Sequence, residues 1–233
     1  MKKNLFASLI LLAICLPAFA QNTFPVRFAQ GTEIFPDNFA STRQFHKVAS
    51  EELVNGLYTR YIQLAKIMNA QERAAFEATG ARVIAYVQFG AYLVLLPQNF
   101  DFKKIEGFSP RSVMPVKPEW KLARSLRELP YGAWAVHGDF IDVNLQLYPS
   151  IRIAEGAALC RSRGLEVLKE GTQNGFVQLR IHKDHLSEVA AMPFVQYLEL
   201  VPPPGQKEDT RSRALHRSNL VASDAPLGKK YDG

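Results

Sequence analysis

The chain has 233 residues and a formal net charge of +6, and its only cysteines are Cys15 and Cys160. Cys15 falls in a segment that we expect to be removed. The remaining chain therefore has one cysteine and cannot form an internal disulfide, so hydrophobic cores must stabilise it. We interpret the small excess of basic residues as a source of solubility and of weak electrostatic attraction at the surface. It does not by itself indicate binding to nucleic acid or to an anionic surface.

The first 20 residues are typical of a secretory signal peptide. Two lysines precede an apolar run at 5–16, and Ala18-Phe19-Ala20 fits the small-x-small cleavage pattern. We expect cleavage between Ala20 and Gln21 and a secreted product, periplasmic or extracellular. The apolar run is too short for a stable membrane anchor. A lipoprotein signal at Cys15 is the weaker alternative, because a large residue precedes that cysteine.

The rest of the chain repeats one pattern at an offset of 84 residues, without a gap. The segments Thr79–Pro97 and Arg163–Lys183 correspond in this way, which predicts one module present twice. The aligned pairs are Gly80 and Gly164, Val83 and Val167, Tyr92 and Phe176, and Leu95 and Leu179.

The first copy has the residues of a strand, a helix, a hairpin, a short helix and an edge strand. Asn69 and Glu72 form a capping-box pattern, and Gly80 supplies a left-handed helix end. Pro115 confines the last segment to a sheet edge or a strand end. The predicted elements are the strand Leu57–Lys66, a helix from Asn69 to about Thr79, the strands Arg82–Phe89 and Tyr92–Leu96 joined through Gly90-Ala91, the short helix Phe100–Glu106 and the extended segment Val113–Val116.

The second copy predicts the same order. Asn174-Gly175 is a strong hairpin signal, Gly164 ends the first helix and Pro193 ends the second. The predicted elements are the strand Phe140–Leu147, the helix Ile151–Arg163, the strands Leu165–Lys169 and Phe176–Ile181, the helix His185–Ala191 and the strand Phe194–Val201.

The β-α-β-β-α-β order predicts an α+β fold with two tandem ferredoxin-like modules, each a sheet with both helices on one face. Alanines at 70, 74 and 78, and at 154 and 158, recur along the main helices, and we expect these small residues to face the sheets. Cys160 takes the position of Phe76 under the offset, so we expect a buried, inert thiol rather than a reactive or dimer-forming one. The expected organisation is a signal peptide (1–20), a lead-in that periodicity does not resolve (21–52), a first module (53–123), a linker (124–138), a second module (139–206), a processing linker (207–213) and a final segment (214–233).

Signals for catalysis or for metal binding are weak. The sequence has no G-x-S-x-G elbow and no Gly-rich phosphate loop. The first polar group consists of His182, Asp184 and His185. It precedes a helix and could suggest a metal site, but a solvated turn explains it. The second consists of His137, Asp139 and Asp142. It has no nearby nucleophile, so we interpret it as part of a linker and the solvent face of a strand. We expect no metal and no cofactor.

The same order of elements occurs in RNA-recognition domains, which stack bases on several aromatic side chains of their central strands. Each corresponding strand here has only one, Tyr92 or Phe176. Export argues further against nucleic acid, so we do not expect it as a partner.

The segment "AAMPFVQYLELV" (Ala190–Val201) resembles the last strand of the inhibitory propeptides of subtilisin-like serine peptidases. A short helix and a proline precede the pattern V-x-Y-hydrophobic-E, which places Val195, Tyr197 and Glu199 at the named positions. "ALHRSNLVASDAPLGKKYDG" (214–233) resembles the N-terminal segment of the subtilisin catalytic domain, where a Y-x-G turn leads to the strand that ends at the catalytic Asp.

Over 21–207 the chain is similar to the tandem pro-region of secreted subtilisin-like peptidases of Bacteroidetes type. "EELVNGLYTRYIQL" (Glu51–Leu64) matches the opening strand of that pro-region. The second copy is the closer match to the inhibitor module. In the first copy, Pro115 and Pro118 interrupt the corresponding last strand, which puts an inhibitory role for it in doubt.

The resemblance implies a pro-region that inhibits a subtilisin-like catalytic domain in cis and assists its folding. The second sheet would dock on that domain, and its last strand would place an extended tail in the substrate cleft. Three consecutive prolines would make the start of the tail rigid. Proteolytic cleavage would follow in the exposed residues beyond them, and we favour the Arg213–Ala214 bond. The exit residues are Pro202, Pro203 and Pro204, and the cleavage candidates are Arg211, Arg213 and Arg217.

The catalytic Asp, His and Ser of the family have no counterpart here. The chain as given is therefore not expected to be catalytic, and we expect the natural protein to continue into a peptidase domain. Two alternatives are a stand-alone secreted peptidase inhibitor and a secreted binding module without a peptidase connection. The catalytic-domain entry segment at the end of the chain argues against the first, and the V-Q-Y-L-E strand together with the "YDG" end argues against the second. For the tail itself, the alternative is a plain solvated linker.

Overall fold

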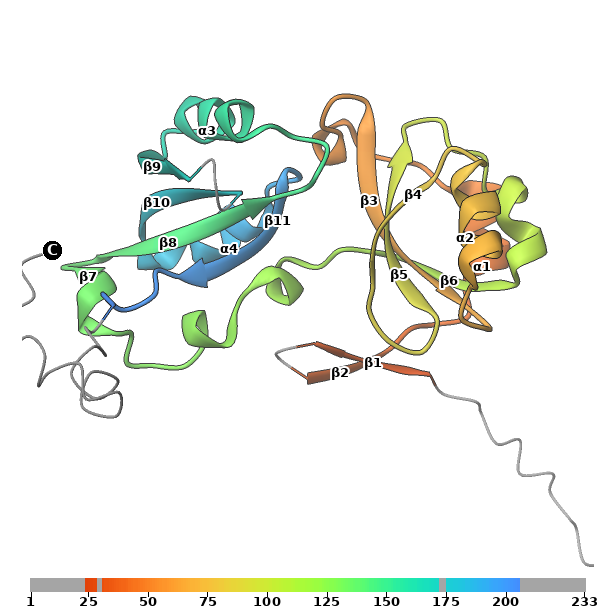
Figure 1. Ribbon diagram of the computed structural model, residues 1–233, viewed down its shortest axis with the longest axis horizontal. Helices are drawn as coiled ribbons and strands as arrows, with labels where there is room; N and C mark the ends of the chain where they lie inside the picture. Colours follow the sequence, from red (N-terminus) through yellow and green to blue (C-terminus); the bar gives the residue numbers. More distant parts are fainter. Residues whose placement is uncertain (1–23, 29–30, 172–174, 206–233) are drawn as a thin grey trace, which may run out of the picture.

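The computed structural model describes residues 24–28, 31–171 and 175–205. It is a mixed α+β structure with antiparallel sheets and few, short helices (Figure 1). Within these residues no helix has the length and apolar character that crossing a membrane requires.

The lead-in forms a small hairpin and a helix that the sequence pattern does not predict. β1 (Pro25–Phe28) pairs antiparallel with β2 (Gly31–Ile34), and α1 (Phe39–Phe45) follows. Just before α1, the Asn38 side chain donates to the carbonyl oxygen of Val113 at 3.0 Å and accepts the backbone N–H of the same residue at 2.9 Å. These two bonds attach the lead-in to the edge of the first large sheet.

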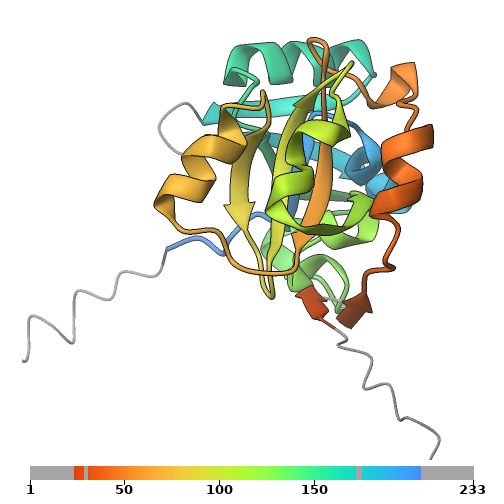
Figure 2. The same cartoon turned by 90° about the vertical axis from the view of Figure 1, so that its right-hand side faces the viewer.

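The first large sheet has the strand order β4-β5-β3-β6. Three helical segments cover one of its faces and lie in front of it in Figure 2. Between them and the sheet lies a core of buried apolar side chains that includes Tyr58, Ile62, Phe76 and Ile105. The strands are β3 (Leu57–Leu64), β4 (Arg82–Tyr86), β5 (Ala91–Pro97) and β6 (Pro110–Pro115), and the helical segments are α1, α2 (Ala70–Glu77) and the 3₁₀ helix Phe102–Phe108.

The second large sheet has the order β11-β8-β10-β9, and the two-residue strand β7 pairs with the start of β8. Apolar residues of β8 and β10 alternate with polar ones, and the apolar set packs with α3 and α4 in one core. The elements are β7 (Val136–His137), β8 (Phe140–Leu147), α3 (Ile153–Ser162), β9 (Glu166–Gly171), β10 (Phe176–His182), α4 (Leu186–Ala191) and β11 (Val195–Leu200).

The two sheets share one arrangement. Counting β3 to β6 and β8 to β11 in chain order, the first and third strands are central and the second and fourth are at the edges. A helix follows the first strand in each case, and a short helical segment follows the third. The predicted order of elements is therefore present in both halves. The gapless offset of 84 is wrong, because β3 and β8 begin 83 residues apart and β5 and β10 begin 85 apart.

Local signals that involve only neighbouring residues are confirmed. The Asn69 side chain accepts the N–H of Glu72 at 2.9 Å, and Glu72 accepts the N–H of Asn69 at 3.0 Å, which closes the predicted capping box. Gly80 and Gly164 have φ of +100° and +75°, as the predicted helix ends require. Of the predicted Asn174-Gly175 turn, Asn174 lies outside the described residues.

Several boundaries differ from the predicted ones. The first hairpin strand ends at Tyr86, because Phe89 and Gly90 both take positive φ in the turn that returns the chain to β5. The helix predicted from Asn69 to Thr79 ends at Glu77, and that predicted at Ile151–Arg163 runs only over Ile153–Ser162. The short helix near Phe100–Glu106 is a 3₁₀ helix two residues further along. Pro115 ends the edge strand β6, as predicted.

The alanine stripes do not face the sheets, and that expectation is wrong. The alanines at 70, 74, 78, 154 and 158 are all exposed. The face of α2 that packs on its sheet carries Phe76, and that of α3 carries Gly156, Ala157 and Cys160. A Cβ at Gly156 would lie 2.2 Å from Cδ1 of Leu147, so the close contact of α3 with β8 depends on this glycine.

The second face of the first sheet is apolar and covered. Tyr61 of β3 packs edge-on against Trp120, with ring centroids 5.6 Å apart, and Phe28 of β1 stacks on Trp120 at 4.4 Å. The Thr59 hydroxyl donates to the Tyr148 hydroxyl at 3.4 Å. Tyr61, Trp120 and Tyr148 belong to one continuous buried cluster that also contains the core of the second sheet, and Phe28 packs against it. The two halves are thus joined by packing as well as by the chain.

Candidate docking surface and exit strand

The second sheet has one apolar face and one polar face. Ile141, Val143 and Leu145 of β8 are fully buried in the core with α3 and α4. The residues between them point the other way, to a surface that we call the open face. By strand register the open face carries Phe140, Asp142, Asn144 and Gln146 of β8, Phe176, Gln178, Arg180 and His182 of β10, and Tyr197 and Glu199 of β11.

The open face combines aromatic and hydrogen-bonding groups. Phe140 is 45% exposed, and Phe176 and Tyr197 are half-buried at the same surface. Burial raises the pKa of Tyr197, and the neighbouring Glu199 carboxylate raises it further. Aromatic side chains set among polar groups are typical of the centres of protein interfaces.

A charged network fixes one end of the open face. Arg180 donates to both carboxylate oxygens of Asp142 at 2.8 and 2.9 Å, and Nε2 of His137 lies 2.9 Å from Oδ2. Burial alone would raise the pKa of Asp142, but the hydrogen bonds and charge of Arg180, together with His137, hold it below its usual range. The network holds the three side chains in fixed positions.

The centre of the open face has an acceptor without a partner. Oδ1 of Asn144 is buried and has no hydrogen-bond donor among the described residues. Such an oxygen loses the hydrogen bonds that water would give it.

The three predicted site residues of β11, Val195, Tyr197 and Glu199, do not all lie on the same face of the sheet. A bulge separates the pair Val195 and Leu147 from the pair Tyr197 and Gln146. Val195 is therefore fully buried, whereas Tyr197 and Glu199 reach the open face. Val195 supports the strand from within, and the other two residues are available to a partner.

The chain leaves β11 in an exposed, extended segment. Pro202, Pro203 and Pro204 are exposed, as is Gly205 after them. Two hydrogen bonds hold the residue before them. The N–H of Val201 donates to the carbonyl oxygen of Asp142 at 3.1 Å, and its own carbonyl oxygen accepts the indole N–H of Trp134 at 2.8 Å.

The outer edge of β11 is partly occupied by the segment between the two sheets. Leu122 forms an isolated parallel bridge with Leu198, and the N–H of Ala123 donates to the carbonyl oxygen of Leu198 at 2.8 Å. Trp134, Leu122 and Ala123 all come from residues that the sequence pattern leaves without structure. Sequence reasoning missed their contacts with β11 and with Val201 because these contacts pair residues more than sixty positions apart.

Several predicted site residues lie outside the described part of the chain. These are the signal-cleavage residues Ala20 and Gln21 and the processing candidates Arg211, Arg213, Ala214 and Arg217.

The remaining polar candidates do not assemble a site for a metal. His182 caps the turn before α4 by accepting the N–H of Asp184 at 3.3 Å. Across the described ranges, no three His, Cys, Asp or Glu side chains gather as metal ligands would. Cys160 is fully buried, which confirms its expected position, and burial raises the pKa of its thiol to about 11.

One feature of the structure has only a faint sequence signal. Lys121 lies between Trp120 and Leu122 and is 5% exposed, and its Nζ donates to the carbonyl oxygen of Met192 at 3.1 Å. Burial lowers the pKa of this ammonium from 10.5 to about 8. The only indication in the sequence is that this lysine stands between two apolar residues, in W-K-L.

A domain family described as Domain of unknown function (DUF8729) matches residues 21–117. The matched segment comprises the lead-in and the first sheet, and it begins at the residue that follows the predicted signal-cleavage point. No curated protein and no solved structure matches the chain.

Proposed function

We propose that the chain is the pro-region of a secreted subtilisin-like serine endopeptidase and consists of two tandem ferredoxin-like modules. The second module holds the catalytic domain inactive and gives it a surface on which to fold. The proposal rests on the resemblance of Ala190–Val201 to the last strand of inhibitory propeptides.

One structural observation carries the proposal. The strand that presents Tyr197 and Glu199 on the open face continues directly into the exposed Pro202–Gly205 segment. The segment that follows β11 would therefore extend in a defined direction toward a partner docked on the open face. An extended segment in a cleft binds through main-chain hydrogen bonds, as an added β-strand does. Prolines reduce the conformational entropy that such a segment loses on binding.

The proposal assigns the two modules different roles. The face of the first sheet that corresponds to the open face carries Tyr61 and Leu93, which are buried in the shared cluster. That face has no room for a second partner. The first module instead supports the second one, and the lead-in hairpin packs on the segment that joins them.

Inhibition in trans tests this function. Residues 21–213 are added to a purified subtilisin-like peptidase, and hydrolysis of a chromogenic peptide is followed. We expect competitive inhibition that fades as the added chain is cleaved. A chain that ends at Val201 keeps the sheet but loses the tail, and its inhibition should be weaker by about tenfold or more.

Two substitutions separate docking from the tail. Tyr197→Ala removes an aromatic group from the open face and should weaken inhibition by about tenfold, as loss of a central interface residue does. Ile67→Ser, at a residue that is 61% exposed and outside the second sheet, is the matched control. A complete chain that leaves hydrolysis unchanged, or a shortened one that inhibits equally well, contradicts the proposal.

The coding sequence beyond Gly233 decides whether the partner is in cis. A following domain with Asp, His and Ser segments of the subtilisin type makes the chain a pro-region. A stop codon together with inhibition in trans would favour a stand-alone secreted inhibitor. A chain that neither inhibits nor precedes a peptidase would favour a secreted binding module.

A further inference from the structure

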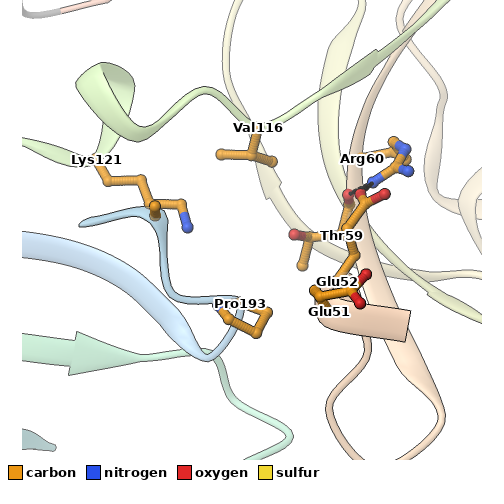
Figure 3. Close-up of a pocket in the computed structure, with 8 residues that line it drawn as sticks. Glu51, Glu52, Thr59, Arg60, Val116, Lys121 and Pro193 are labelled. Carbon is orange, nitrogen blue, oxygen red and sulfur yellow. Dashed lines mark hydrogen bonds and ion pairs between the residues drawn. The ribbon is translucent and has the colours of Figure 1, made fainter. Parts of the chain in front are cut away.

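A cavity of about 190 Å³ lies where the two halves of the molecule meet. Glu51, Glu52 and Thr59 line it from the first half, Pro193 lines it from the second, and Lys121 comes from the joining segment (Figure 3). At about 30 Å³ for each water molecule, the volume equals that of roughly six waters. It is the size of a small organic molecule rather than of a peptide.

One wall of the cavity carries a buried cation. Figure 3 shows the Lys121 side chain extending from its wall toward the space between the two halves. Its ammonium group has three N–H donors, and one of them reaches the carbonyl oxygen of Met192. Within the described ranges Lys121 forms no ion pair, and burial alone accounts for its lowered pKa. The other two donors have no hydrogen-bond acceptor among the described residues, and the ring centroid of Tyr148 lies 5.9 Å from Nζ.

The opposite wall carries carboxylates. Glu52 pairs with Arg60, with 2.6 Å between Oε2 and Nη1, which leaves its other oxygen to accept the N–H of Ala49 at 3.3 Å. Glu51 accepts a hydrogen bond from its neighbour Ser50 at 3.0 Å and has no cationic partner in the described part of the chain. Arg60 lines the same wall and neutralises Glu52, so the charges that remain unpaired across the cavity, among the described residues, are those of Lys121 and Glu51.

We propose that this cavity binds a small zwitterion of the α-amino acid class, with its carboxylate on Lys121 and its ammonium toward Glu51. A simple anion would satisfy Lys121 but would leave the carboxylate of Glu51 without a cationic partner. A simple amine would leave Lys121 without an acceptor. A molecule with both charges complements both walls and fits the volume. The site is independent of the proposed peptidase partner, since it lies away from the open face.

Ligand-dependent thermal unfolding of residues 21–233 tests the site. A ligand that binds only the folded chain raises the midpoint of unfolding with its concentration. At millimolar concentration we expect glycine and alanine to raise the midpoint, whereas acetate and methylammonium, which each carry one of the two charges, leave it unchanged. Calorimetric titration of the same compounds gives their affinities.

Lys121→Met identifies the contact. The variant keeps the apolar stem but loses the charge, and the amino acids should bind it about tenfold or more weakly, as expected when a charge-assisted hydrogen bond is removed. Lys104→Met, at an exposed lysine of the first half, is the matched control and should bind like the parent chain. Glu51→Gln should also weaken binding.

Three outcomes would overturn the proposal. If none of the four compounds shifts the midpoint, the cavity holds only water. If acetate is as effective as glycine, the cavity is an anion site. If Lys121→Met binds the amino acids with unchanged affinity, they bind elsewhere on the chain.

Discussion

The indole N–H of Trp134 donates a hydrogen bond to the carbonyl oxygen of Val201 over 2.8 Å. The bond joins the segment between the two sheets to the last residue before the three prolines. It fixes the point at which the chain leaves the second sheet.

Replacing Trp134 by Phe keeps an aromatic ring and removes this hydrogen bond. We expect the free energy of unfolding to fall by about 1 kcal/mol, the typical net contribution of one hydrogen bond. Urea denaturation measures the loss. Leu129→Ala, at a residue that is 76% exposed, should change stability by less than about 0.5 kcal/mol. An unchanged midpoint for Trp134→Phe would show that the exit is held by other contacts.

Asp142→Asn removes the carboxylate charge and leaves Arg180 at most one acceptor where it now has two. We expect a loss of about 2 kcal/mol at neutral pH, because hydrogen bonds to charged groups contribute more than neutral ones. The pKa of Asp142 is lower in the folded chain than in the unfolded one. Its stabilising contribution is therefore complete above the unfolded pKa of about 4 and is lost as the pH falls below that value.

Denaturation curves between neutral pH and pH 3 check this dependence. The variant should lose less stability over the acid range than the parent chain does. Asp139→Asn, whose neighbour Lys183 lies 4.0 Å away at an exposed site, is the control and should follow the parent curve. Parallel curves for Asp142→Asn and the parent would contradict the assignment.

Lys121→Met removes a buried charge, so the folded chain should become more stable at neutral pH. The pKa of Lys121 falls from 10.5 to about 8 on folding. Between these values the unfolded chain binds a proton that the folded chain does not, so stability rises with pH. The difference amounts to about 3 kcal/mol.

The free energy of unfolding, measured in steps from pH 7 to pH 10, follows this rise. It should be present in the parent chain and in Lys104→Met, and absent in Lys121→Met. A parent curve without the rise would mean that the ammonium is stabilised by an acceptor in the cavity.

Tyr61→Ala removes buried aromatic contacts between the two halves. Tyr61 is 8% exposed and contacts both Phe28 and Trp120. Loss of a buried aromatic ring costs about 3 to 5 kcal/mol. Because the cluster is continuous, the parent chain should unfold in one transition when followed by tryptophan fluorescence and by far-ultraviolet circular dichroism.

The same two probes should report a lower midpoint in Tyr61→Ala. Phe45→Ala, at a residue that is 77% exposed, is the control. Separate midpoints for the two probes in the parent chain would show that the halves unfold independently.

Sequence patterns predicted those features of the fold that depend on near neighbours. The Asn69 capping box and the glycine helix ends need only a few adjacent residues, and the alternation in Phe140–Leu147 gave the limits of β8. The alanine stripes failed because a four-residue period fits any face of a helix. The larger residue Phe76, and Cys160 at the matching position, mark the buried side.

Features built from distant residues could not be predicted. The lead-in hairpin owes its position to the stacking of Phe28 on Trp120, and the exit depends on Trp134. The open face was partly predictable, since Tyr197 and Glu199 alternate with apolar residues in β11. The bulge that turns Val195 inward is set by pairing with β8 and leaves no pattern in the chain.

Two edge strands of the molecule are closed to further pairing over part of their length. In the first sheet, Pro110 and Pro115 end β6 and offer no N–H to a neighbouring chain. In the second, Leu122 and Ala123 lie along β11. An unprotected edge is a template on which copies of a protein assemble into aggregates. The segment between the sheets therefore has a protective effect as well as a connecting one, because it covers part of the edge strand β11.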